Sequence, residues 1–137
     1  MKAFIDSSAL VKKYIHEQGS QDLDALLENV TDIVISPTFW LELTSALQRR
    51  TADKSITATQ AAWLKKQCQH DLIYFHKVIW NSLLEETAAK LILKYRLKTL
   101  DSLQLASAAV ARADIFVTSD KQLFQAAHKE LRPARLI

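Results

Sequence analysis

The sequence has little glycine and cysteine, and each shortage excludes a class of site. Among 137 residues there is one glycine, Gly19. Phosphate-cradling loops and dinucleotide-binding motifs both need several glycines at fixed spacing, so neither can be present. A single cysteine, Cys68, cannot form an internal disulfide or a metal site built from thiolates. We therefore expect Cys68 to be a small buried or half-buried residue of a protein in a reducing compartment.

Long hydrophobic runs are also missing. The apolar start of the chain is broken by Asp6, so it lacks the core of a signal peptide, and no stretch approaches the roughly 20 apolar residues of a membrane span. These features predict a cytoplasmic protein with no membrane partner. Hydrophobic residues make up 49% and charged residues 24%, as in ordinary globular proteins. The length suits one core, so we expect residues 1–137 to form a single domain.

The net charge is modestly positive, +3 at pH 7, and basic residues occur in pairs such as Lys12-Lys13 and Arg49-Arg50. Modest basicity of this kind fits a polyanionic partner. For any single pair, a solvated helix face is an equally good explanation.

The first ten residues contain the stretch around which the chain is organised. Residues 3–5 are a continuous apolar run, which predicts a strand buried on both faces, and the acid Asp6 follows directly. Ser7 or Ser8 can cap the helix expected next. Asp6 is then expected where open α/β sheets bind ligands, in the crevice beyond the carboxyl ends of the strands.

Strands alternate with helices along the rest of the chain. This order predicts an α/β fold, a three-layer α/β/α sandwich with a mainly parallel central sheet and right-handed crossovers. Further strands are expected over residues 32–36 and 114–118, a short strand or extended connection over 72–79, and an edge strand over 133–137. Helices are expected over residues 8–15, 20–30, 57–71, 82–95, 101–113 and 121–130, and after Pro37.

In this arrangement three more acids return to the edge that holds Asp6. Asp120 follows a strand, Asp101 opens a helix, and Glu42 lies one turn into the helix after Pro37. Two of them have simpler explanations. Spacing alone favours Glu42 as an exposed helix acid. Asp101 begins an Asp-x-x-Gln pattern with Gln104 and could be only a helix N-cap.

Carboxylates that converge in a partly desolvated crevice repel one another, so some would take up protons or the group would bind a divalent cation. Ligation by oxygen alone favours Mg²⁺ or Mn²⁺ over zinc. A cation of this kind can activate water and neutralise a phosphoryl oxygen, which is the chemistry of phosphodiester hydrolysis. Nearby hydroxyls could orient the carboxylates, bind phosphate or cap helices; they belong to Ser7, Ser8, Thr118 and Ser119.

Four segments resemble one known family. They are FIDSSALV at residues 4–11, ISPTFWLEL at 35–43, LKTLDSLQLA at 97–106 and FVTSDKQL at 116–123. In this order and at these separations they are similar to the PIN-domain ribonucleases, and within them to the VapC-like toxins of bacterial and archaeal toxin–antitoxin pairs. The resemblance spans nearly the whole chain.

The resemblance implies cleavage of RNA by an endonuclease that depends on Mg²⁺ or Mn²⁺. It places Asp6, Glu42, Asp101 and Asp120 around one or two metal ions. It also implies a homodimer and a small antitoxin whose tail occupies the active-site groove. Many relatives carry histidine at the position of Gln104. Candidate contacts to the RNA backbone are Lys12, Lys13, Arg49 and Arg50.

Other classes of protein fit the sequence less well. A receiver-type phospho-acceptor domain would need a pair of acids at the first strand, but Asp6 is followed by Ser7 and Ser8. A phosphatase with a nucleophilic aspartate would need a second aspartate where Ser8 stands. A further alternative is a PIN fold with incomplete metal chemistry that only binds RNA or protein, and the intact set of four acids argues against it.

Overall fold

The computed structural model describes residues 1–131 and 133–137, and these contain a five-stranded sheet in the order β3-β2-β1-β4-β5. The pairings along this order are all parallel. The strands are β1 (Lys2–Ile5), β2 (Asp32–Ile35), β3 (His76–Lys77), β4 (Ile115–Thr118) and β5 (Ala134–Leu136). The helices are α1 (Ser7–Leu10), the 3₁₀ helix η1 (Val11–Lys13), α2 (Ser20–Leu27), α3 (Phe39–Ala52), α4 (Ala58–Asp71), α5 (Ser82–Tyr95), α6 (Thr99–Val110) and α7 (Lys121–Glu130).

The central strand β1 sets the position of the site. It pairs with β2 on one side, with Ala3 opposite Ile33, and with β4 on the other, with Phe4 opposite Phe116. The strand order therefore reverses at β1, and open α/β sheets bind ligands beyond the carboxyl end of such a strand. Asp6 is the first residue after β1.

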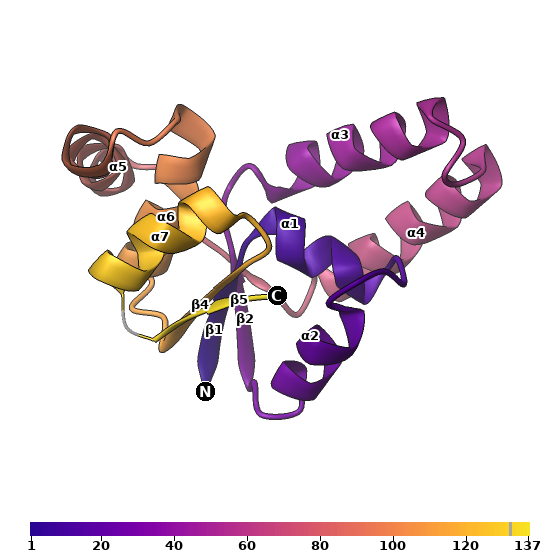
Figure 1. Ribbon diagram of the computed structural model, residues 1–137, viewed down its shortest axis with the longest axis horizontal. Coiled ribbons are helices and arrows are strands. Elements are labelled where there is room, and N and C mark those ends of the chain that lie inside the picture. The colour runs from indigo at the N-terminus through magenta and orange to yellow at the C-terminus, as the bar shows by residue number, and fades with distance from the viewer. Residues whose placement is uncertain (132) are drawn as a thin grey trace.

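Helices cover both faces of the sheet and give it three layers (Figure 1). Because side chains alternate along a strand, Ala3 and Ile5 face one core and Phe4 faces the other. The first core contains residues of α1, α2, α3 and α4, and the second contains residues of α5, α6 and α7. In the second core the rings of Phe4 and Phe116 stack with their centroids 5.2 Å apart. The predicted α/β/α sandwich is confirmed.

Local sequence signals set several helix boundaries. The Thr57 hydroxyl accepts a bond from the Gln60 amide N–H at 3.1 Å, and the Gln60 side chain accepts one from the Thr57 N–H at 2.8 Å. This capping box starts α4 where the pattern predicts. The edge strand predicted over residues 133–137 forms as β5 beside β4.

Other boundaries differ from the prediction. The helix expected over residues 8–15 is shorter, with α1 passing into η1 at Val11. The helix expected over residues 101–113 begins earlier, at Thr99, because the extended backbone of Lys98 precedes it. It ends at Val110. Within residues 72–79 only His76 and Lys77 form a strand.

The helix α3 carries two different faces. Phe39, Leu43 and Leu47 are buried in the first core, while Glu42 and Arg49 line the groove described below. By contrast α6 is buried over the continuous run 102–108, as expected for a central helix. In the part of the chain that is described, no helix combines the length and apolar character that crossing a bilayer requires.

Candidate active site

Asp6 is held at the carboxyl end of β1 and is only 4% exposed. Its backbone N–H donates to the Val117 carbonyl at 2.8 Å, which ties it to β4. Its Oδ2 accepts hydrogen bonds from Ser8 Oγ at 2.6 Å and from Thr118 Oγ1 at 2.7 Å. Burial raises the pKa of Asp6; these two hydroxyls oppose that rise, and the charge of Asp120 adds to it.

Two of the predicted hydroxyls therefore orient a carboxylate. Ser8 Oγ binds Asp6 and also accepts the Ser119 amide N–H at 3.1 Å. Thr118 Oγ1 binds Asp6 and accepts the Asp120 N–H at 3.0 Å. The capping alternative is wrong for the start of α1, whose N-cap is Asp6 with no hydrogen bond from its side chain.

Asp120 begins α7 beside this cluster. Its Oδ1 accepts the Leu123 amide N–H at 2.9 Å, so Asp120 is the N-cap of α7. The alternative cap at Ser119 is wrong. The negative charge of Asp120 contributes to raising the pKa of both Asp6 and Asp101, which places the three acids in one electrostatic field.

Asp101 lies inside the first turn of α6. The N-cap of that helix is Lys98, with no side-chain hydrogen bond, so the interpretation of Asp101 as an N-cap is wrong. Burial raises the pKa of Asp101 most strongly, the charges of Asp120 and Asp6 raise it further, and Lys98 opposes the rise. Asp101 therefore faces the other acids.

Glu42 is half-buried in the first turn of α3, so the interpretation as an exposed helix acid is wrong. Its Oε1 accepts hydrogen bonds from Thr38 Oγ1 at 2.6 Å and from Gln104 Nε2 at 2.5 Å. Burial is the main cause that raises the pKa of Glu42, and the charges of Asp6 and Asp101 contribute. The four predicted acids, from four parts of the chain, thus meet at one edge of the sheet.

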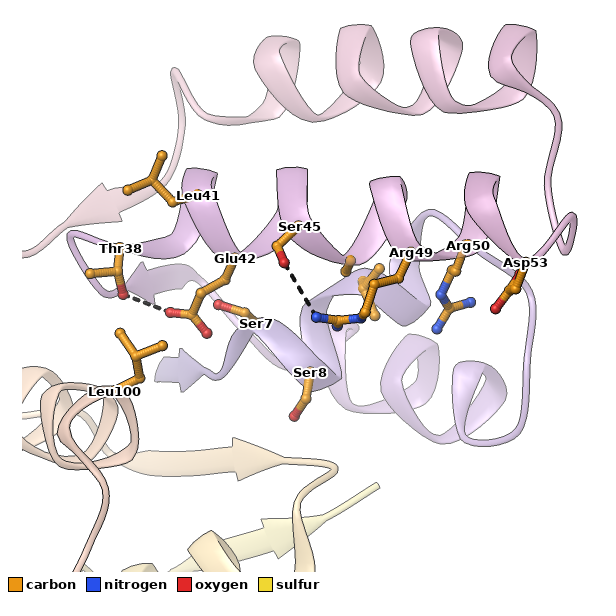
Figure 2. A pocket seen from close by; sticks show the side chains of 12 residues that line it. Ser7, Ser8, Thr38, Leu41, Glu42, Ser45, Arg49, Arg50, Asp53 and Leu100 are labelled. Atoms are coloured by element: carbon orange, nitrogen blue, oxygen red, sulfur yellow. Dashed lines mark hydrogen bonds between the residues drawn. The ribbon is translucent and has the colours of Figure 1, made fainter.

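A groove of about 720 Å³ runs from this edge along α3 (Figure 2). Ser7 and Glu42 lie at one end, and Asp53 lies at the other. Arg49 and Arg50 line it between these ends. The guanidinium of Arg49 donates to Ser45 Oγ at 3.3 Å, whereas that of Arg50 pairs with Glu17 at 2.7 Å.

The other predicted basic residues lie elsewhere. Lys12 Nζ donates to the Gln18 carbonyl at 2.6 Å and pairs with Glu17 at 3.3 Å. Lys13 Nζ pairs with Asp71 at 2.6 Å. Neither lines the groove.

Two residues that act on the acids of the site were not among the predicted acids, hydroxyls and cations. Lys98 is exposed, and its charge acts on Asp101 from three positions earlier in the chain. Gln104 is buried and binds Glu42. Both lie in the segment 97–106, three positions before and three positions after Asp101, and this spacing was the only feature of the sequence that could have indicated their roles.

The chemistry of the donors fits a hydrated Mg²⁺ or Mn²⁺ ion. Carboxylate and hydroxyl oxygens line the site, and these hard cations prefer oxygen ligands. Over residues 1–131 and 133–137, no three Asp, Glu, His or Cys side chains are arranged so that they could hold an ion directly. Mg²⁺ usually keeps several waters and binds proteins through one or two carboxylates, so such an arrangement is not required.

The fold and the site together define a class: a three-layer α/β/α domain whose central parallel strand ends in a carboxylate, with three more acids beside it. A model of the PIN domain matches residues 3–129, and the chain belongs to the PIN-domain family. No curated protein sequence matches it.

Solved structures of similar fold agree with this assignment. A toxin–antitoxin complex from Klebsiella pneumoniae is 19% identical with a TM-score of 0.68, and the match covers 89% of each chain. VapBC2 from Rickettsia felis, bound to a promoter DNA fragment, is 14% identical with a TM-score of 0.66, covering 100% of this chain and 98% of that one. VapC20 from Mycobacterium tuberculosis, described as a toxin that cleaves the sarcin-ricin loop, is 14% identical with a TM-score of 0.67, covering 96% and 99%. The fold is that of a VapC-like PIN-domain protein.

Proposed function

We propose that residues 1–137 form a single PIN-like nuclease domain that hydrolyses RNA phosphodiester bonds with the help of Mg²⁺ or Mn²⁺. The observation that carries the proposal is the electrostatic coupling of four carboxylates beyond the carboxyl end of β1. They are Asp6, Glu42, Asp101 and Asp120. Four acids beside one another are costly unless protons or a cation compensate their charge.

These four carboxylates are the residues that would hold the cation. When bound, it would activate water and neutralise charge on the phosphoryl oxygens during in-line displacement. Ser8 and Thr118 keep Asp6 in one orientation through hydrogen bonds of 2.6 and 2.7 Å. Fixed side chains lower the cost of reorganisation at the moment of reaction.

The groove along α3 would receive the RNA backbone. Arg49 lines it, and a planar guanidinium binds phosphate well. Arg50 also lines the groove but shares its charge with Glu17, so we expect a smaller contribution. Lys12 and Lys13 would contribute least, because both are ion-paired away from the groove.

We further propose that the protein is the cytoplasmic toxin of a toxin–antitoxin pair, with a small antitoxin as its partner. The similar structure from K. pneumoniae is described as a toxin–antitoxin complex, and the one from R. felis as VapBC2 bound to a fragment of promoter DNA. A homodimer is also part of the proposal, and Trp63 and Trp80 are large exposed side chains, 59% and 49% exposed, that could contribute to contacts. Expression without a partner should arrest growth, and expression of Asp101→Asn should not. Normal growth with soluble, active wild-type protein would contradict the toxin role.

The nuclease activity is tested with purified protein and RNA. Wild-type protein should cleave RNA with Mg²⁺ or Mn²⁺ and should lose activity in EDTA. Folded Asp101→Asn, which keeps the shape of the side chain but removes its charge, should lose activity in all conditions. Equal cleavage in EDTA and by Asp101→Asn would indicate a contaminating nuclease or another site, and would contradict metal-dependent cleavage at these four acids.

A second candidate is a PIN-fold module that binds RNA or protein without cleaving it. It is favoured by one observation, that no three ligating side chains in the described ranges are arranged to hold an ion directly. RNA binding by wild-type protein without cleavage in either metal would support this candidate.

A further inference from the structure

Gln104 is a buried amide that joins two helices at the acidic site. It is only 2% exposed, and its Nε2 donates to Glu42 Oε1 at 2.5 Å across a separation of 62 positions in the chain. Thr38 Oγ1 donates to the same oxygen at 2.6 Å. Two neutral donors, one from α6 and one from the residue before α3, therefore bind one oxygen of this carboxylate.

Packing alone does not account for an amide at this position. Burying a polar group costs free energy unless it is hydrogen-bonded, and a methionine would fill a similar volume without that cost. Only one end of this amide is satisfied, because Gln104 Oε1 is buried with no hydrogen-bond partner among the described residues. The bond to Glu42 is the interaction that explains why the residue is polar.

The position of Gln104 on its helix links it to the acids. Asp101 and Gln104 are three residues apart, so they lie on the same face of α6. That face therefore carries Asp101, an acid of the site, and one turn later Gln104, which donates a hydrogen bond to Glu42 of α3. Glu42 Oε2, the oxygen that neither donor binds, lies on the side of the carboxylate away from Thr38 and toward the Ser7 hydroxyl, which also acts on this carboxylate (Figure 2).

We propose that Gln104 is a positioning residue, which fixes the orientation of Glu42 through Oε1 and leaves Oε2 available to a divalent cation. This inference rests on the proposed function, because it assigns a role at the same site. Partners that orient metal-binding carboxylates typically contribute tenfold to hundredfold to metal affinity or activity. Gln104 acts on the reaction through Glu42 and need not touch RNA.

The test replaces Gln104 by methionine and measures Mn²⁺ binding by electron paramagnetic resonance, independently of activity. Gln104→Met should bind Mn²⁺ about tenfold to hundredfold more weakly and lower kcat by a similar factor, with KM for RNA unchanged. Gln104→His should recover part of both losses, because a ring N–H can donate to Glu42. Ser107→Ala is the matched control, since Ser107 is also buried on α6 and its hydroxyl has no partner in the described structure.

Several results would overturn the inference. One is that Gln104→Met has the same Mn²⁺ affinity and kcat as the wild type. Another is that Ser107→Ala loses as much Mn²⁺ affinity and kcat as Gln104→Met, which would indicate an effect of the general packing of α6. If wild-type protein neither binds Mn²⁺ nor cleaves RNA, the proposed function itself is wrong. If Gln104→Met does not fold, nuclear magnetic resonance of the wild type decides instead. The side-chain amide hydrogens of Gln104 should exchange slowly and should lose this protection in Glu42→Ala, and rapid exchange in the wild type would contradict the inference.

Discussion

Thr118→Val should destabilise the protein in a way that depends on the charge of Asp6. The hydroxyl of this fully buried residue donates to Asp6 Oδ2 at 2.7 Å and accepts the Asp120 N–H at 3.0 Å. Valine has nearly the same shape, so the variant removes both bonds without creating a cavity. A hydrogen bond to a charged group contributes about 1.5–3 kcal/mol, and leaving a partner unsatisfied costs about 1–3 kcal/mol. We expect a loss of about 2–4 kcal/mol in the free energy of unfolding at neutral pH.

The sign of the pH dependence follows from the raised pKa of Asp6, which burial causes. A carboxyl group whose pKa is higher in the folded than in the unfolded state loses its proton at a lower pH in the unfolded state. The free energy of unfolding therefore falls as the pH rises through the folded-state pKa. The Thr118 hydroxyl stabilises the ionised form and limits this loss. Its removal should therefore cost more at about pH 7 than at about pH 4, because the raised pKa favours the protonated form of Asp6 as the pH falls.

The assay is urea unfolding in EDTA, followed by tryptophan fluorescence at both pH values. Thr118→Ser is the control, since it keeps the hydroxyl and should retain the bonds. A loss that is the same at both pH values, or below about 0.5 kcal/mol at neutral pH, would show that the bond to Asp6 is not a significant interaction.

Three further predictions concern the cation and the groove. Mg²⁺ should raise the melting temperature of wild-type protein, because a ligand that binds only the native state stabilises it, and Asp101→Asn should show little rise. Because burial raises the pKa of Asp6, Glu42 and Asp101, protons should compete with Mn²⁺ for these carboxylates at a higher pH than they do for ordinary ones. The affinity for Mn²⁺, measured by calorimetry, should therefore fall as the pH is lowered from neutral. Arg49→Ala should weaken RNA binding and reduce the dependence of log affinity on log salt by about one, whereas Lys66→Ala, outside the groove, should change neither. The first prediction would be contradicted by a melting temperature that Mg²⁺ leaves unchanged, and the second by an Mn²⁺ affinity that does not depend on pH. The third would be contradicted if Arg49→Ala and Lys66→Ala had equal effects on RNA binding.

Much of the fold could be predicted because its signals are local. Residues 3–5 and 115–117 are continuous apolar runs, and both form buried strands. The capping box at Thr57 needs only residues within one turn. The edge position of Asp6 follows from the rule that parallel strands end at one edge.

The details of the site depend on contacts that spacing does not reveal. Glu42 is half-buried and binds Gln104, which lies 62 positions away in the chain, so its place in its own helix does not reveal its burial. The cap of α6 depends on where the backbone of Lys98 leaves the extended conformation, and this decides against Asp101 as a cap. Pairs of basic residues looked alike in the sequence, but Lys13 is paired with Asp71 from α4 while Arg49 lines the groove.

Anomalous diffraction from crystals grown with Mn²⁺ would show whether the four acids together bind one or two divalent cations. We expect an anomalous peak among the carboxylates of Asp6, Glu42, Asp101 and Asp120, which disappears in crystals of Asp101→Asn. Ordered carboxylates with no peak between them at saturating Mn²⁺, or a peak only elsewhere on the protein, would contradict this expectation.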